Sequence, residues 1–444
     1  MIRLLWLEFK HLFLKRSTLC LFLLMIVFVT FNTINEQKIV YENSYATSAY
    51  RDDGTLVEGK DLLSYINQIK NEYAGVITTQ WQEKVEKDLE KAEKEAMLIH
   101  VDQSAMIEQY GEDWLTQFEQ TPDTFVAITK EDEINRTDFD EEKVPFYVKD
   151  YIPLIRESVL FQIKQDGNMI LSKPWLNLTK SEYKNQFGET HTIVDYLSLR
   201  VVESKEQLKI FQDKMNQIPE FHYGSYHGWD ALIRSLASFR FILAIFIVYV
   251  TSSALNKDYS SHTIDIIKTT SLGKSKIVIA KLAAITLTCI SIVACYCLIP
   301  TLFVYYYYGL GNWNINISFM INIITPYTFQ QAYLGGVLLL LAGSITTGLI
   351  SACLSAYLRK GFVSFAISLL FLVLPSAVSS SFSILFPVNY MDFSGIYFNC
   401  EMLELWNTFY FAPTFIYGFT GIVFIIGIAL IISRYRSYAV TKTT

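Results

Sequence analysis

The chain has 444 residues, of which 51% are hydrophobic and 18% charged, and its mean hydropathy is +0.26. Its formal net charge of −6 combines two unlike parts: residues 36–240 hold 37 Asp and Glu against 23 Lys and Arg, whereas the rest holds 6 against 14. The acidic part argues against nucleic acid as the partner, because surfaces that bind nucleic acid are basic.

Six apolar stretches each come close to the roughly 20 residues that a helix needs to cross the hydrocarbon core of a bilayer. They cover residues 17–35, 235–256, 278–304, 331–357, 362–386 and 409–433. The sequence therefore predicts an α-helical polytopic membrane protein with six transmembrane helices.

Basic residues assign the segments between these stretches to the two sides of the membrane. Lys and Arg occur in 1–16, 257–277, 358–361 and 434–444, whereas 305–330 and 387–408 contain none. Under the positive-inside rule the first group is cytoplasmic and the second external, which agrees with alternation through six crossings. We expect both termini in the cytoplasm and residues 36–230 outside the cell, as a large domain between the first and second crossings.

Residues 1–16 precede the first membrane helix at 17–35. Apolar side chains recur there at helical spacing, namely Ile2, Leu5, Trp6, Phe9 and Phe13. This pattern is typical of an amphipathic helix in the membrane interface. We expect a cytoplasmic elbow helix; the alternative is an N-terminal extension of the first membrane helix. Because no small-x-small cleavage site follows the apolar run, we expect an anchor and not a cleaved signal peptide.

The external domain at 36–230 is expected to be mixed but mainly helical. Residues 80–96 have Glu and Lys three and four apart and predict a solvated helix, and 203–217 predict a second one. No cysteine lies between Cys20 and Cys289, which suits a bacterial cell membrane better than an animal secretory protein. The aromatic segment 221–229 is expected to form a turn at headgroup level.

Motifs for catalysis or for a bound cofactor are not found. His222 and His227 are five residues apart, which is not the i, i+4 spacing of a helical ligand pair, so we expect no metal site. Gly273-Lys274-Ser275 is no P-loop, because Lys268 stands where a P-loop needs glycine. We therefore expect a protein that is not catalytic by itself.

The cytoplasmic segment 257–277 gives the strongest functional signal. Thr263, Ile264, Ile267, Lys268 and Leu272 lie on or near one face of a predicted short helix. Apolar side chains surrounded by polar ones beside a bilayer are typical of a surface that binds another protein. We expect a docking helix here.

At this point the chain resembles the permease subunits of bacterial type-2 ABC exporters. In that family the first cytoplasmic loop has an acidic residue, Gly-Thr, a short apolar helix, a small-residue turn, a basic residue and Gly-Lys. Here these places hold Asp258, Thr263, Ile264 to Ile267, Ser271, Lys276 and Ala280-Lys281, and His262 and Ala280 replace the two glycines.

The resemblance implies a coupling helix that docks on a cytoplasmic ABC ATPase through Asp258, Thr263, Ile264, Ile267, Lys268 and Leu272. It also implies six crossings per subunit in the remaining fold (231–444 for crossings two to six), an elbow helix, and short external re-entrant helices before the last crossing. ATP and magnesium would be bound by the ATPase. A second permease copy or a homologous permease, and membrane lipid, complete the implied partners.

Two features of the membrane half have alternative interpretations, and a third disfavours one class of transporter. Residues 387–408 form either a re-entrant segment or an aromatic external loop. A stripe of small residues in 331–357 serves internal packing more readily than a dimer seam; its members are Gly343, Thr347, Gly348, Ser351, Ala352 and Ser355. Arg240 and Lys281 lie near span ends, and no Asp or Glu occurs between 266 and 391, so we expect no acidic partner at mid-depth. This disfavours a proton- or sodium-coupled carrier.

We expect an exporter of an amphipathic peptide, a lipid or a hydrophobic compound, because the membrane half is apolar and rich in aromatic residues. Sodium or drug efflux is an alternative within the same family. A membrane sensor, or a peptide-immunity protein whose extracellular domain binds a ligand, is the alternative from another class, and it predicts no ATPase partner.

Overall fold

The computed structural model describes residues 2–44, 48–51, 55–100, 103–114, 116–117, 155–173, 175, 180–184, 190–194, 205–256, 276–319, 325–358, 360–373, 381–405 and 408–437. The chain divides into two compact units. We call Met1–Ile39, Leu178–Pro219 and Tyr226–Thr444 the membrane unit, and Val40–Asn177 with Glu220–Ser225 the helical unit. The predicted domain at 36–230 is thus divided, because residues 178–219 group with the membrane unit.

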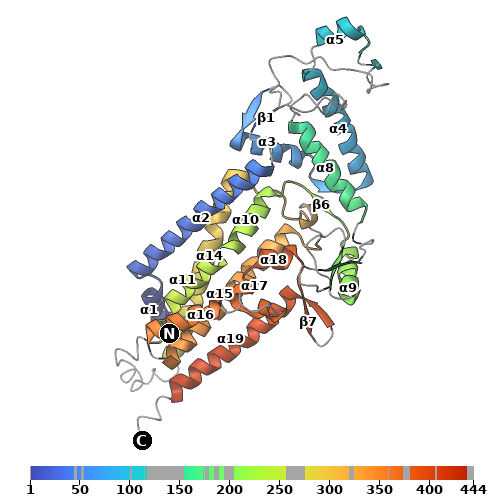
Figure 1. Cartoon of the computed structure of the whole chain (residues 1–444). Helices are drawn as coiled ribbons and strands as arrows, with labels where there is room; N and C mark the ends of the chain where they lie inside the picture. Colours follow the sequence, from blue (N-terminus) through green and yellow to red (C-terminus); the bar gives the residue numbers. More distant parts are fainter. Residues whose placement is uncertain are drawn as a thin grey trace. The chain divides into compact units, whose positions relative to one another are not determined.

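Apolar helices, four of them long, make up most of the described part of the membrane unit (Figure 1). They are α1 (Ile2–Leu12), α2 (Arg16–Ser44), α10 (His227–Ser238), α11 (Arg240–Thr251), α14 (Lys276–Tyr308), α15 (Phe329–Leu358), α16 (Gly361–Val373) and α19 (Ala412–Ser437). Among the described residues, α2, α14, α15 and α19 are long and apolar enough to cross a membrane, and α10 with α11 makes a fifth span if the bent pair counts as one. The stretch predicted at 362–386 contains the 13-residue α16, while residues 374–380 lie outside the described part.

The second predicted crossing is a broken helix and not a continuous span over 235–256. α10 and α11 meet at an angle of 45°. The Arg240 guanidinium turns back to the Ala237 carbonyl at 3.1 Å. A side chain that enters the hydrogen-bond ladder in this way is a recognised cause of a sharp kink, and sequence hydropathy does not reveal it.

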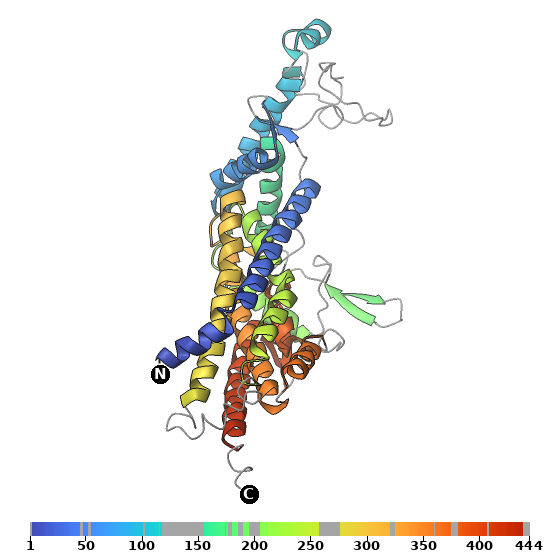
Figure 2. The same ribbon diagram turned by 90° about the vertical axis from the view of Figure 1, so that its left-hand side faces the viewer.

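Helix α15 is the centre of the membrane unit, where it packs against α11, α14, α16 and α19 (Figure 2). Its stripe of small residues is buried. A Cβ atom on Gly348 would lie 3.1 Å from Cys289 Sγ of α14 and 3.4 Å from Thr251 Cγ2 of α11. This stretch of the stripe is therefore occupied by the chain's own helices, which confirms internal packing there.

Short elements fill residues 381–411 before the last long helix. They are η5 (Ser381–Leu385), α17 (Pro387–Tyr390), α18 (Phe393–Phe398) and the antiparallel strands β7 (Met402–Leu405) and β8 (Thr408–Phe411). α17 and α18 pack on α15, where a Cβ atom on Gly336 would overlap the Phe393 ring and one on Gly343 would overlap Met391. The two glycines of α15, which have no side chain, thus make room for these two short helices.

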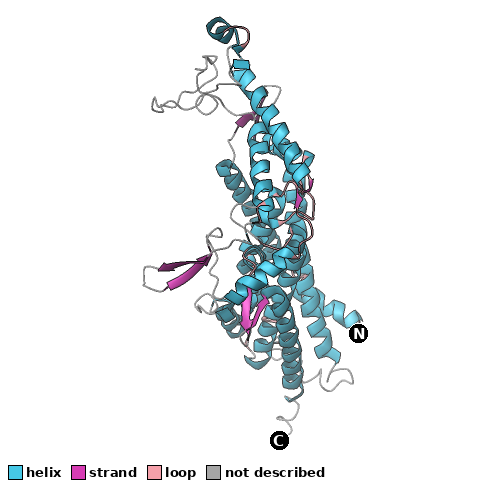
Figure 3. Ribbon diagram, turned by 90° about the vertical axis from the view of Figure 1, so that its right-hand side faces the viewer, coloured by secondary structure: helices cyan, strands magenta, loops and turns pink. Residues whose placement is uncertain are grey.

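A second hairpin and a helix complete the membrane unit. Strands β4 (Lys180–Lys184) and β5 (Thr190–Val194) pair antiparallel, and α9 (Lys205–Asn216) corresponds to the helix predicted at 203–217. Figure 3 shows described strands, in magenta, as short antiparallel pairs. Lys214 Nζ of α9 lies 5.9 Å from the centre of the Phe411 ring in β8, a cation–π contact that joins residues 205–216 to this unit.

The helical unit is built from α3 (Gly59–Glu72), α4 (Thr79–His100), α5 (Gln103–Tyr110) and α8 (Ile155–Leu171). α8 packs against α3 and α4. α4 contains the helix predicted at 80–96, but one face of it is buried, through Val85, Leu89 and Ala92, and so it is only partly solvated. The apolar core also includes Leu62, Ile66, Leu160 and Ile163, each fully buried.

Short strands close the helical unit. β1 (Ser48–Tyr50) pairs with β2 (Leu56–Glu58), and β3 (Gly75–Val76) pairs with β6 (His222–Tyr223). The Phe221 ring lies tilted against Trp175 with a centroid distance of 5.4 Å. Residues 220–225 thus belong to this unit, and Tyr223 is fully buried in it. The turn predicted for 221–229 is therefore a strand at His222–Tyr223, because these residues pair with Gly75–Val76.

Candidate functional site

The predicted docking residues lie outside the part of the chain that the structure describes. Asp258, Thr263, Ile264, Ile267, Lys268 and Leu272 all fall in 257–275, between the end of the α11 region at Asn256 and the start of α14 at Lys276. The docking surface therefore stays a prediction. What the structure does describe is how the two ends of this loop are held, and that geometry decides which helices the loop can move.

The leading end of the loop is fixed to α15. The Asn256 backbone N–H donates to Ser355 Oγ at 3.0 Å, and Asn256 is buried. The Asn256 amide also lies against the start of α16, since a Cβ atom on Gly361 would be 3.0 Å from Asn256 Nδ2. A glycine at 361 allows this close approach. A displacement of the loop at Asn256 would therefore reach α11, α15 and α16 together.

The trailing end of the loop is fixed to the N-terminal helix. Lys281 Nζ, on the second turn of α14, lies 3.1 Å from Glu8 Oε2 of α1, and the Lys281 side chain is only 6% exposed. A buried ammonium needs such a partner, because an unpaired charge away from water is costly. Aromatic rings continue the contact from α1 through α2 to α11, in the order Phe9, Phe13, Phe22 and Phe246.

The N-terminal residues form a helix separate from the first span. α1 ends at Leu12 and α2 begins at Arg16. The predicted apolar side of α1 is partly buried, since Phe9 and Phe13 are each 8% exposed, whereas Trp6 is 56% exposed. The alternative of one continuous helix from residue 2 onward is excluded by the break at Phe13–Lys15.

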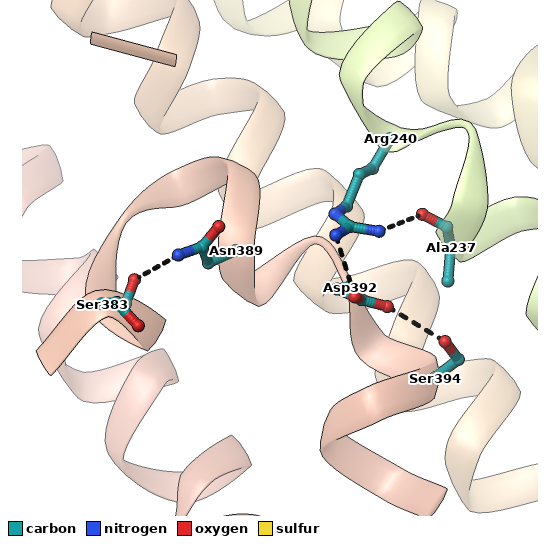
Figure 4. Close-up of polar contacts among 6 residues, drawn as sticks. All are labelled: Ala237, Arg240, Ser383, Asn389, Asp392 and Ser394. Carbon is teal, nitrogen blue, oxygen red and sulfur yellow. Dashed lines mark hydrogen bonds and ion pairs between the residues drawn. The ribbon is translucent and has the colours of Figure 1, made fainter. Parts of the chain in front are cut away.

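A second ion pair lies at the bend of the second crossing. Arg240 NH2 is 3.0 Å from Asp392 Oδ2, in the connection between α17 and α18. Ser394 Oγ donates to Asp392 Oδ1 at 3.0 Å, and Asn389 Nδ2 donates to the Ser383 carbonyl at 2.8 Å, which holds this connection in shape (Figure 4). The bend between α10 and α11 is therefore tied to the short helices that precede the last span.

Arg240 and Lys281 thus have acidic partners, which the sequence did not predict. The expectation of no acidic partner rested on residues 266–391, whereas the partners are Glu8 and Asp392. Asp392 follows directly after that window, and Glu8 lies at the opposite end of the chain. Tertiary structure alone brings these groups together, so sequence spacing gave no signal for either pair.

Aromatic residues fasten the start of α10 inside the membrane unit. Trp229 is fully buried and donates from Nε1 to the Gly311 carbonyl at 3.1 Å. Its ring contacts Trp313 and Tyr333, at centroid distances of 4.8 and 5.5 Å. The Trp229 side chain is therefore part of the core of the membrane unit, while its expected level at the headgroups stays a prediction.

An apolar cavity of about 220 Å³ lies among α11, α15, α16, α17 and α19. Phe371, Leu372, Phe386 and Phe419 are among its lining residues, and Thr346, Thr347 and Ser368 supply hydroxyls. Tyr390 OH donates to Thr346 Oγ1 at 3.1 Å, whereas the buried Thr347 hydroxyl has no hydrogen-bond partner among the described residues. The cavity suits an apolar group that carries at most one polar atom. Within the described residues, no group of three or more His, Cys, Asp or Glu could hold a metal ion.

The comparisons with known proteins agree with this architecture. No curated protein and no solved structure matches the chain. The family model described as "ABC-2 family transporter protein" matches residues 2–391, which include the elbow, the first five predicted crossings and the short helix α17. The chain therefore belongs to the ABC-2 transporter family, as a multi-pass membrane permease subunit that is not itself catalytic.

Proposed function

We propose that this permease is the membrane-spanning part of an ATP-driven exporter in a bacterial cytoplasmic membrane. The family match over residues 2–391 carries the proposal. In the proposed topology the chain crosses the membrane six times, with both termini and segment 257–277 in the cytoplasm and the domain at 36–230 outside. The distribution of Lys and Arg between the apolar stretches supports this orientation.

The proposed partner is a separate ABC ATPase that grips segment 257–277. Asp258, Thr263, Ile264, Ile267, Lys268 and Leu272 form the docking surface. Nucleotide-driven movement of the ATPase would pull on the loop ends, which are fixed to α15 at Ser355 and to α1 at Glu8. Because interfaces of packed helices rearrange between discrete states, a shift at the loop would reorient α11 and α14 as units.

Export needs the outer ends of the helices to respond as well. The bend at Phe239 and the ion pair of Arg240 with Asp392 join α11 to the short helices α17 and α18. A rotation of α11 would move these short helices, which we propose are the external re-entrant helices of the family. Two permease copies, or one copy with a homologous permease, would enclose the pathway with two ATPases.

The proposed cargo is an amphipathic peptide, a lipid or another hydrophobic compound. The apolar cavity of about 220 Å³ supports this class over sugars or ions, because its wall is formed by phenylalanine and leucine side chains. A sodium ion needs a nearly complete shell of oxygen ligands. The described lining of this cavity offers three hydroxyls, those of Thr346, Thr347 and Ser368, and no carboxylate.

The test is co-purification of the tagged full-length permease from its own host, with and without Ile264→Asp/Ile267→Asp. Two new charges on the apolar face should abolish association with a stoichiometric ATP-binding subunit, because a carboxylate buried at an interface loses its hydration. Ser260→Asp/Ser261→Asp is the matched control: it adds the same charge to the same loop and should retain the ATPase.

Three results would contradict the proposal. The wild-type chain could come alone from every preparation, the Ile variant could keep its ATPase, or both double variants could lose it equally. If the Ile264→Asp/Ile267→Asp variant protected cells from a peptide as well as the wild type does, the protein would instead be the peptide-immunity protein considered above.

A further inference from the structure

A second cavity, of about 370 Å³, lies at the opposite end of α11 from the bend with α10. It is bounded by the junction of α1 and α2, the end of α11 and the start of α16. We call it the elbow cleft. It does not overlap the lining of the apolar cavity, and no step of the proposed transport cycle uses it.

One wall of the elbow cleft is polar and positively charged. Lys15, Ser17 and Thr18 form it at the N-terminus of the 29-residue helix α2. The Leu19 N–H bonds to the Lys15 carbonyl at 2.9 Å, so the N–H groups of the preceding residues lie before the first intrahelical bond. Such N–H groups and the positive end of the helix dipole favour an anion. Thr18 is only 3% exposed and its hydroxyl makes no hydrogen bond with another described residue.

The opposite wall is mainly apolar. Phe362 is 83% exposed, and Phe365 and Tyr249 line the cleft as well, together with Ser252 and Ser253 just after α11. A soluble anion would gain nothing from phenylalanine rings, whereas an acyl chain would cover them. None of the described residues that line the cleft is acidic. Glu8 of α1 forms its ion pair with Lys281. Lysine and hydroxyls on one wall and aromatic rings on the other match a molecule with an anionic head and a hydrocarbon tail.

We propose that the elbow cleft binds one anionic phospholipid, with its phosphate at Lys15, Ser17 and Thr18 and the first part of an acyl chain against Phe362 and Phe365. The proposal rests on the cytoplasmic position of the elbow. Net positive charge in residues 1–20, from Arg3, Lys10, Lys15 and Arg16 against Glu8, would raise the local concentration of anionic lipid.

The bound lipid would regulate coupling. Gly361 lines the cleft and also lies against Asn256, the last described residue before the docking loop. A lipid seated between α2, α11 and α16 holds the start of α16 against the end of α11 and so stiffens the loop at Asn256. Loss of the lipid would weaken transmission from the ATPase without removing the docking surface.

The experiment is lipid binding to the full-length protein in detergent, measured by native mass spectrometry with phosphatidylglycerol and phosphatidylcholine. Wild-type protein should prefer phosphatidylglycerol. Lys15→Gln should weaken phosphatidylglycerol binding about tenfold, as expected for loss of one charge-assisted contact. Lys10→Gln is the matched control, because Lys10 is exposed on α1 and does not line the cleft. Thr18→Val should produce a smaller loss.

Equal binding by the Lys15 and Lys10 variants, or equal binding of the two lipids, would overturn the proposal. Inorganic phosphate that displaces the lipid at comparable concentration would show a site for soluble anions instead. Lipid binding is measured without an ATPase, so the lipid proposal and the exporter proposal can fail separately. A permease that binds the lipid but co-purifies with no ATPase would refute the exporter proposal alone.

Discussion

At the scale of single residues, the charges inside the membrane unit are the positions that sequence reasoning handled least well. Arg240 and Asp392 are separated by most of the membrane half of the chain, yet their side chains are 3.0 Å apart. Hydropathy treats each as an isolated charge near a span end. Only the bend at Phe239 and the turn between α17 and α18 bring them together, and neither feature leaves a periodic signature.

The Arg240–Asp392 pair should behave as one unit in a double-mutant cycle. The two side chains are 21% and 34% exposed, so we expect a coupling of about 1–2 kcal/mol, between the values for exposed and buried pairs. Arg240→Gln and Asp392→Asn should each lower the midpoint of thermal unfolding, and the double variant should lower it no further than either alone. Additive losses would show that the pair does not stabilise the bend.

At the scale of elements, the sequence located the helices well and their ends less well. Residues 80–96 and 203–217 were predicted as helices because of their helix-forming composition, and α4 and α9 occupy them. The stripe of small residues predicted close helix packing, which the contacts of Gly343 and Gly348 confirm. The strand at 222–223 could not be predicted, since its partner Gly75–Val76 is distant in sequence and each strand has two residues.

The contact between α3 and α8 contains a buried pair of titratable groups whose energetics depend on pH. Lys70 is fully buried, and its burial lowers the pKa to about 8, while the neighbouring Asp166 carboxylate opposes that shift. Burial likewise raises the pKa of Asp166 to about 7, against the opposing effect of Lys70. Desolvation thus dominates both shifts and disfavours both charged forms.

These shifts predict that the helical unit is least stable near neutral pH. The raised pKa of Asp166 contributes stability that is present in acid and is lost as the pH rises through about 7. The lowered pKa of Lys70 contributes stability that is present in alkali and is lost as the pH falls through about 8. Hydrogen exchange of α8, corrected for its intrinsic pH dependence, should therefore be slower at pH 6 than at pH 7.5.

Asp166→Asn provides the control for this pH dependence, because the amide keeps the size of the side chain and cannot titrate. In this variant exchange in α3 and α8 should no longer be slower at pH 6 than at pH 7.5, and any remaining pH dependence should have the opposite sign, because loss of the carboxylate lowers the Lys70 pKa further. The exchange of α14 and α15 should stay unchanged. A pH difference that persists in the variant would assign it to another group, such as Glu93, whose pKa is also raised by burial.

At the scale of the whole molecule, apolar length and charge were enough to predict a polytopic membrane protein, and the resemblance of the loop at 257–277 was needed to predict a permease. The family model confirms the resemblance that the loop at 257–277 indicated. The residues of that loop fall outside the described structure. A surface that docks on another protein is completed by that protein. The sequence therefore predicts the surface, and the complex has to supply its geometry.

Membrane topology is the whole-molecule prediction on which the proposed direction of export and the lipid site both depend. An epitope tag inserted after Glu112, an exposed position beyond α5, should be labelled by antibody on intact cells, because alternation places residues 36–230 outside. A tag at the C-terminus should be labelled only after the membrane is permeabilised, since Arg434 and Arg436 favour the cytoplasmic side. Labelling of both tags on intact cells would require an even number of crossings between them and would contradict the five that the proposed topology has there. A tag after Glu112 that is labelled only after permeabilisation would place the domain inside the cell and, across the single crossing of α2, the elbow outside it, which would contradict both the lipid site and the proposed direction of export.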